Sequence, residues 1–139
     1  MAELTLKFNV RPQAHQSVKI GRNGIAYQPK KVRDFKNYIR KLTKDQLESD
    51  FRRIGAGTPI IVEYLHYQFK YLSNTPKKNR YVGLIKTTKP DLLDNLNKAF
   101  IDALEGIVFE QDQNIVEVRS LKKFYGEEDC IMMKLVWED

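Results

Sequence analysis

Between residues 91 and 112 the chain carries four aspartates and one lysine at short spacing: Asp91, Asp94, Lys98, Asp102 and Asp112. Carboxylates that lie close together repel one another, so the ionised form of each is disfavoured. A bound divalent cation removes that repulsion, and clusters of carboxylate oxygens suit magnesium or manganese. If the fold brings these side chains together, the spacing predicts an oxygen-rich metal site with a lysine beside it.

A helix from about Asp94 to Glu105 is expected to position most of these side chains. At about 100° per residue, its apolar residues fall on one face and predict a contact with the core: Leu96, Ala99, Phe100, Ala103 and Leu104. The opposite face is a charged ridge formed by Asp94, Lys98, Asp102 and Glu105. Purely structural explanations stay open, because Asp94 is also a good N-cap residue, and Lys98 with Asp102 is also an ordinary i,i+4 surface pair.

The other two aspartates flank this helix. Asp91 precedes it in an extended or turn conformation, and Gly106 reverses the chain after it. A short strand, 107–109, then leads to Asp112. A strand that returns beside the helix start would bring Asp112 near Asp91 and Asp94, so the convergence of the three carboxylates depends on this reversal.

Length and composition are those of a soluble globular chain. We assign residues 1–139 to one domain, because this length is sufficient for a hydrophobic core. No apolar run approaches the roughly 20 residues of a membrane span, and the N-terminus lacks the apolar stretch of a signal peptide. The single cysteine, Cys130, cannot form an internal disulfide, so a reducing cytoplasm is the simplest location.

Charge is distributed unevenly along the chain. Residues 1–89 hold 19 Lys/Arg and 6 Asp/Glu, whereas residues 90–139 hold 5 and 12. The windows 4–33 and 64–90 contain seven and six basic residues and no acid. Such asymmetry is typical of a nucleic-acid-binding surface, although ordinary solvated lysines remain an alternative. The candidate DNA contacts are Arg11, Lys30, Lys31, Lys77, Lys78, Arg80, Lys86 and Lys89.

Hydrophobic periodicity predicts the remaining elements. Strands are expected near residues 4–10, 59–72, 115–125 and 130–137, and the last two are expected to pair as a hairpin. Pro29 is expected to open a helix whose apolar stripe is Val32, Phe35, Ile39 and Leu42. Residues 11–28 and 73–89 are expected to be loops, the second broken by a short strand at 81–85. The order β-α-β-α-β-β predicts an α+β fold with a mixed sheet and two main helices.

The acidic segment resembles a known family signature. It reads Lys-Pro-Asp-Leu-Leu-Asp-Asn-Leu-Asn-Lys, then Asp-Ala-Leu, a glycine, a short apolar stretch and Gln-Asp, which resembles the motif of RusA-type Holliday-junction resolvases. A weaker resemblance extends over the basic N-terminal half and so covers nearly the whole chain. The resemblance assigns Asp91, Asp94 and Asp112 to the catalytic, metal-binding carboxylates of that family, and Lys98 to its essential lysine.

Two other residues match further positions of the motif, and the chain departs from the motif twice. Asn95 and Asp102 are the matching residues, and they would support the site. The family has one residue between its first two aspartates, whereas this chain has the pair Leu92-Leu93, so either a local bulge absorbs the extra residue or the first aspartate is displaced. The family's later aspartate pair is here Gln111-Asp112, which leaves the number of metal ions open.

The resemblance implies a function and its partners. It implies hydrolysis of DNA phosphodiester bonds with Mg²⁺, or Mn²⁺ in its place, and no small-molecule cofactor. It also implies a homodimer that cuts four-way junctions by paired nicks in the cytoplasm of a bacterial host, without a membrane role and with a phage or prophage origin. A metal-dependent nuclease for flaps, forks or RNA stays open, as does a non-catalytic DNA-binding protein. His15 and His66 do not resemble a metal-binding pair.

Overall fold

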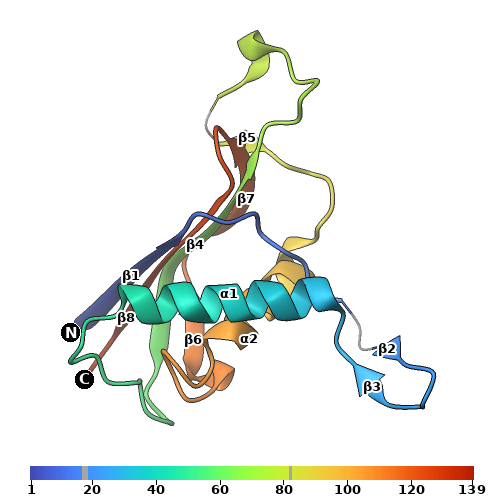
Figure 1. The fold of residues 1–139 in the computed structure, drawn as a ribbon. Coiled ribbons are helices and arrows are strands. Elements are labelled where there is room, and N and C mark those ends of the chain that lie inside the picture. The colour runs from blue at the N-terminus through green and yellow to red at the C-terminus, as the bar shows by residue number, and fades with distance from the viewer. Residues whose placement is uncertain (17–18, 82) are drawn as a thin grey trace.

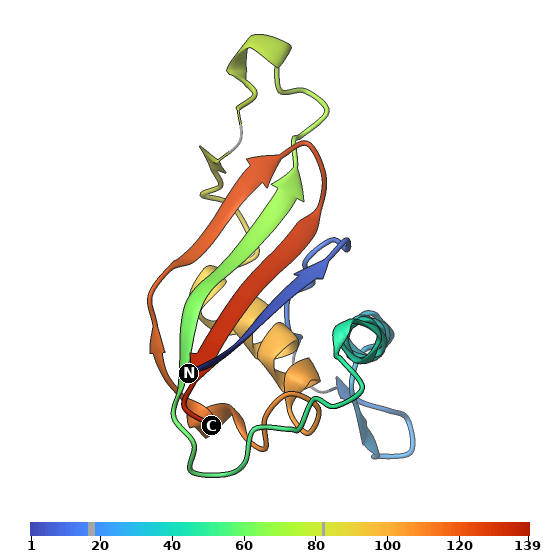
Figure 2. The ribbon, with the colours of Figure 1, turned by 90° about the vertical axis from the view of Figure 1, so that its left-hand side faces the viewer.

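The computed structural model describes residues 1–16, 19–81 and 83–139. Its centre is a six-stranded mixed sheet (Figures 1 and 2). In sheet order its strands are β1 (Ala2–Phe8), β8 (Cys130–Trp137), β4 (Ile60–Lys70), β7 (Leu121–Gly126) and β5 (Leu84–Ile85), while β6 (Ile115–Val118) also pairs with β4. The sheet and two main helices confirm the expected α+β fold.

The central strand β4 corrects one expectation. Its β-branched and aromatic residues fill the core: Ile60, Val62, Leu65, Tyr67 and Phe69 are buried. β4 is antiparallel to β8 and parallel to β7 and β6, so it lies between the two segments that we expected to form a hairpin. A hairpin of β7 with β8 would leave the long strand β4 with an unpaired edge, and inserting β4 between them satisfies the backbone groups on both of its sides.

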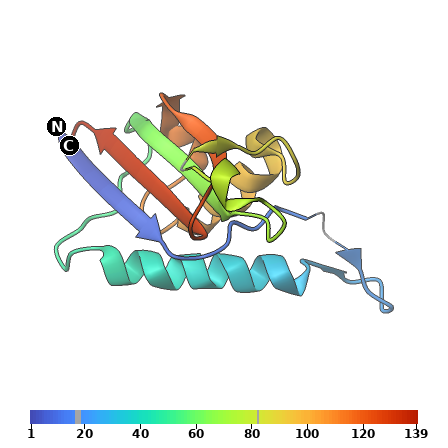
Figure 3. The ribbon, with the colours of Figure 1, turned by 90° about the horizontal axis from the view of Figure 1, so that it is seen from above.

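The two helices lie on one side of the sheet. α1 (Lys30–Gln46) begins directly after Pro29 and runs along the β1 side, where it packs against α2 (Asn97–Leu104) (Figure 3). The expected stripe of α1 is confirmed: Val32, Phe35 and Ile39 are buried and Leu42 is half-buried. All five residues of the expected core face of the second helix are buried as well: Leu96, Ala99, Phe100, Ala103 and Leu104.

A π-helical turn precedes α2 and accounts for the extra residue after Asp91. The turn spans Leu92–Leu96, and its backbone closes with an i→i+5 hydrogen bond from the Leu96 N–H to the Asp91 carbonyl, at 3.2 Å. A π turn holds one residue more than an α turn, so it absorbs an insertion without breaking the helix. The regular helix therefore begins at Asn97, and the expected start near Asp94 lies inside the π turn.

The segments between the main elements complete the description. β2 (Lys19–Ile20) and β3 (Ala26–Tyr27) form a small hairpin within the expected loop, and its Asn-Gly turn places Gly24 at a φ of 78°. Residues 17 and 18, in the same expected loop, lie outside the described residues, as does residue 82 in the expected strand 81–85. The part of that strand that the structure describes is β5. None of the described helices is both long and apolar enough to span a membrane.

The expected short strand at 107–109 is wrong, because this segment is a turn. Phe109 makes isolated β-bridges to Ile54 and Glu105 instead of joining a sheet. Gly106 adopts a φ of 80°, which allows the chain to reverse directly after the helix. The reversal that the sequence predicts is therefore present, but a tight turn produces it.

Candidate active site

Five of the predicted site residues line one cavity of about 650 Å³: Asp94, Asn95, Lys98, Asp102 and Asp112. Asp94 comes from the π turn, Lys98 and Asp102 from successive turns of α2, and Asp112 from the segment that follows the Gly106 reversal. His15, from the loop after β1, lines the same cavity. Three chain segments therefore contribute polar side chains to one site, and the one that carries His15 lies far from the other two in sequence.

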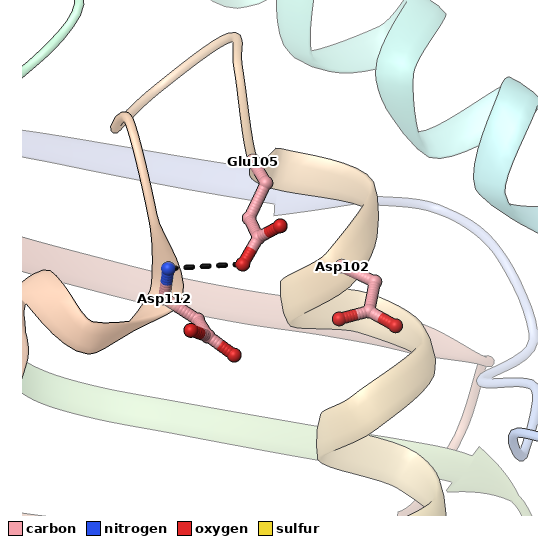
Figure 4. Close-up of side chains that lie close together, drawn as sticks. All are labelled: Asp102, Glu105 and Asp112. Atoms are coloured by element: carbon pink, nitrogen blue, oxygen red, sulfur yellow. Dashed lines mark hydrogen bonds between the residues drawn. The ribbon is translucent and has the colours of Figure 1, made fainter.

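Three carboxylates from this region form a compact group. Oxygens of Asp102, Glu105 and Asp112 all lie within 4.8 Å of one another (Figure 4). Asp102 lies on the last turn of α2, and Glu105, three residues later, follows directly after the end of the helix. The Glu105 carboxylate accepts a 2.9 Å hydrogen bond from the Asp112 backbone N–H, which ties the returning segment to the helix end. We call this set the carboxylate group.

Contacts from neighbouring segments position the carboxylate group. Arg40 of α1 donates hydrogen bonds of 3.0 Å to the carbonyls of Ala103 and Glu105, and so satisfies backbone acceptors at the C-terminal end of α2. Lys36 of α1 forms an ion pair with Asp102 at 3.4 Å. Among the described residues Asp102 forms no ion pair with Lys98, so the i,i+4 surface pair left open by the sequence is not present. Lys98 is exposed and faces the cavity.

The chemistry of the carboxylate group fits a hard divalent cation. Its donors are oxygens alone, the type that Mg²⁺ and Mn²⁺ prefer. Two oxygens bound to one octahedral Mg²⁺ lie about 3–4 Å apart, given metal–oxygen distances of about 2.1 Å, so small side-chain movements would complete such a site. Glu105 is the member that the resemblance did not indicate. Its position three residues after Asp102, on the charged ridge of the expected helix, was the feature of the sequence that could have indicated it.

Asp91 lies apart from the other predicted carboxylates. It lines a neighbouring cavity of about 500 Å³, together with Arg11 and Lys89. Its carboxylate accepts a 2.7 Å hydrogen bond from the Asn95 backbone N–H and a 3.3 Å one from the Asn95 side chain. Asp91 therefore caps the π turn, the role that the sequence offered as an alternative for Asp94. The metal-binding role that the resemblance gives Asp91 stays a prediction.

Two substitutions separate a capping role from a catalytic role of Asp91. Asparagine caps a helix as well as aspartate does, so Asp91→Asn should keep the π turn, while Asp91→Ala should cost about 1 kcal/mol of unfolding free energy. If Asp91 acts mainly as a cap, Asp91→Asn will retain DNA cleavage within about tenfold of wild type. Thermal melts and cleavage rates of both variants test this. A fully folded Asp91→Asn variant without cleavage would instead identify Asp91 as a metal ligand.

The candidate DNA contacts fall into two groups in the structure. The side chains of Lys30, Lys31, Lys77, Lys78 and Lys89 are exposed. The other three already contact protein groups: Arg11 pairs with Asp129, Arg80 lies over the Tyr71 ring, and Lys86 lies over the Phe69 and Tyr125 rings. Lys86 is only 6% exposed, so its ammonium is far less accessible to a phosphate than those of the exposed lysines.

Comparison with known proteins identifies the family. A family model described as endodeoxyribonuclease RusA matches residues 8–135, which is nearly the whole chain. The chain belongs to the RusA family. The uncharacterized protein YqaN of Bacillus subtilis (strain 168) is 31% identical over 112 residues, which cover 77% of this chain and 76% of YqaN. Membership in the RusA family places the chain among the endodeoxyribonucleases, which hydrolyse phosphodiester bonds in DNA.

His15 is a site residue of this RusA-family chain that the sequence did not reveal. Its backbone N–H donates to the Asn95 carbonyl at 2.8 Å, which joins the loop after β1 to the π turn. Burial, followed by the positive charges of Lys98 and Lys36, lowers the pKa of the His15 imidazole, while Asp102 raises it. A lone histidine in a loop carries no periodicity or spacing that could indicate such a position.

Proposed function

We propose that this RusA-family protein is a Mg²⁺-dependent endonuclease that resolves four-way DNA junctions by paired phosphodiester hydrolysis, acting as a homodimer. The observation that best supports the proposal is the cavity shared by Asp94, Lys98, Asp102 and Asp112, which combines motif carboxylates with the motif lysine. Mn²⁺ is expected to substitute for Mg²⁺ because both prefer carboxylate oxygens. We place the protein in the cytoplasm of a bacterial host, with a phage or prophage origin.

The charged residues in and beside the cavity each have a role in this proposal. Asp102, Glu105 and Asp112 would hold the cation, which supplies Lewis acidity and an activated water when bound. Asp94 is exposed in the same cavity, where its carboxylate can accept a hydrogen bond from the attacking water or extend the ligand set. Lys98 places a positive charge where negative charge develops on the phosphate in the transition state.

The basic surface would bind the DNA backbone rather than its sequence. Exposed lysines in the loop between β4 and β5 neutralise phosphates, and such contacts position DNA without reading its bases. Selectivity for a junction would then come from shape and from the symmetry of the dimer. A two-fold dimer presents two active sites to a four-way junction, which allows two symmetric strands to be cut.

A cleavage panel tests the proposal directly. Purified protein is incubated with Mg²⁺, Mn²⁺ or EDTA and with a mobile four-way junction, a linear duplex, a flap or a fork. We expect paired, symmetric nicks in the junction that depend on the metal. Faster cleavage of flaps or forks would identify a nuclease with a different substrate. Binding of the junction without cleavage in either metal would identify a non-catalytic DNA-binding protein.

The salt dependence of binding tests the role of the basic loop. Lys77→Ala/Lys78→Ala removes two exposed cations, so the slope of log K against log salt should become shallower by up to about 1.8 per subunit. Binding to junction and duplex should weaken alike. The control is Lys41→Ala/Lys44→Ala on α1, which removes the same charge from an exposed helix surface. Equal slopes for both double variants would place the DNA away from this loop.

A further inference from the structure

His15 has a buried ring nitrogen without a hydrogen-bond partner in the described part of the chain. Its Nδ1 atom is shielded from solvent and has no hydrogen-bond partner among the residues that the structure describes. Buried polar atoms are nearly always paired, because an unpaired one costs about 1–3 kcal/mol. The ring also lines the cavity of the carboxylate group. Rotation of the ring about its Cβ–Cγ bond would bring a ring nitrogen to this cavity, where a ligand can supply the missing partner.

The surroundings of the ring favour an anionic ligand over a metal ion. Lys98 and Lys36 act on the ring electrostatically and outweigh the opposing effect of Asp102, and cations disfavour a further cation there. Within the described residues, the set of possible ligands to one ion contains Asp102, Glu105 and Asp112 but not His15. His15 therefore shares the cavity with Lys98 without belonging to the carboxylate group, and a phosphate that contacts both side chains would be stabilised there.

The backbone holds His15 where such a contact is useful. Its main chain is tied to Asn95, and Asn95 is held by the Asp91 carboxylate. The chain of contacts fixes the loop after β1 against the π turn that carries Asp94. A substrate-contact residue needs this preorganisation, because a hydrogen bond aimed at a reacting group is effective only when its position is fixed beforehand.

We propose that His15 is a substrate-contact residue whose imidazole N–H donates a hydrogen bond to a non-bridging oxygen of the scissile phosphodiester. This inference rests on the proposed function, because it assumes that DNA phosphate enters the cavity. The two residues would act together on the phosphate. Lys98 would supply a positive charge, and His15 would supply a hydrogen-bond donor with a fixed direction. Hydrogen bonds to charged groups are stronger and more directional than neutral ones, so this contact would orient the phosphate.

Substitution of both histidines tests the proposal. His15→Ala should lower kcat/KM for junction cleavage about 10- to 100-fold, the effect of losing one hydrogen bond to a charged group. His15→Asn and His15→Gln each keep one side-chain N–H, and at least one of them should recover most of the loss. His66 is the matched control, because it lies on β4, bonds to Ser120 and does not line the cavity. His66→Gln should cleave like wild type.

A spectroscopic measurement on the unaltered protein does not depend on how the variants fold. The chain contains two histidines, so imidazole ¹⁵N spectra of labelled wild type show two rings, and the spectrum of His66→Gln assigns them. Intact four-way junction is added with Ca²⁺, and a gel confirms that the DNA is uncut. We expect the His15 nitrogens to shift and the His66 nitrogens to stay unchanged.

The outcomes separate this inference from the proposed function. Wild type that cleaves no DNA in Mg²⁺ or Mn²⁺ contradicts the proposed function. If wild type cleaves and a folded His15→Ala variant cleaves at the same rate, only the role of His15 is contradicted. The same holds if bound junction leaves the His15 signals unchanged. If His15→Ala fails to fold, the asparagine and glutamine variants and the wild-type spectrum decide.

Discussion

Asp112→Asn should strongly reduce metal-dependent DNA cleavage while DNA binding persists. The substitution keeps the shape of the side chain and removes one of the three charges that would hold the cation. If the lost coordination costs about 4 kcal/mol of transition-state stabilisation, the rate falls about 10³-fold. Removing a negative charge should leave junction affinity equal or higher, because DNA is an anion. Single-turnover nicking and gel-shift affinity, measured together, test both parts.

A control and a metal titration make this prediction specific. Asp45→Asn removes one carboxylate from the exposed surface of α1, away from the cavity, and should cleave like wild type. Asp112→Asn should also need more Mn²⁺ to reach its residual rate, because the carboxylate group is one ligand short. Cleavage by Asp112→Asn at the wild-type rate and metal dependence would mean that the carboxylate group is not the metal site.

Lys98→Ala should reduce the cleavage rate at least about 10²-fold without a matching loss of stability. Removing a group that stabilises transition-state charge typically has an effect of this size. The side chain is exposed and forms no ion pair with Asp102 in the described structure, so the unfolding free energy should change by only a few tenths of a kcal/mol. Comparing kcat with KM tests the role, because a transition-state contact lowers kcat more than it raises KM.

The control for Lys98→Ala removes an equal charge elsewhere. Lys41→Ala on α1 should lower DNA affinity slightly through net charge and leave kcat unchanged. The argument for Lys98 fails if its alanine variant loses only affinity, or if a large loss of stability accounts for the lost activity. In the first case Lys98 would be an ordinary phosphate contact, and in the second a structural residue.

Local periodicity in the sequence was sufficient to predict which residues of the two helices are buried. The spacing of apolar residues correctly predicted which face of each helix is buried, because a helix repeats every 3.6 residues whatever it packs against. Ile39 and Phe100, in the middle of these two faces, are fully buried. The same spacing placed Lys98 and Asp102 together on the opposite face, where both line the cavity. The motif around them was sufficient to suggest the family.

Tertiary structure alone decided which side chains meet. The pairing of β4 with β7 and β8, and the reversal at Gly106 that brings Asp112 to Glu105, join residues distant in sequence, and no local pattern encodes such contacts. Asp91 matches the motif, yet the π turn directs its carboxylate to Asn95. His15 reaches the cavity from a loop some eighty positions before Lys98, and it is held there by a single backbone hydrogen bond to the π turn. Periodicity predicts the face that a residue occupies, whereas chain reversals and strand order determine its neighbours.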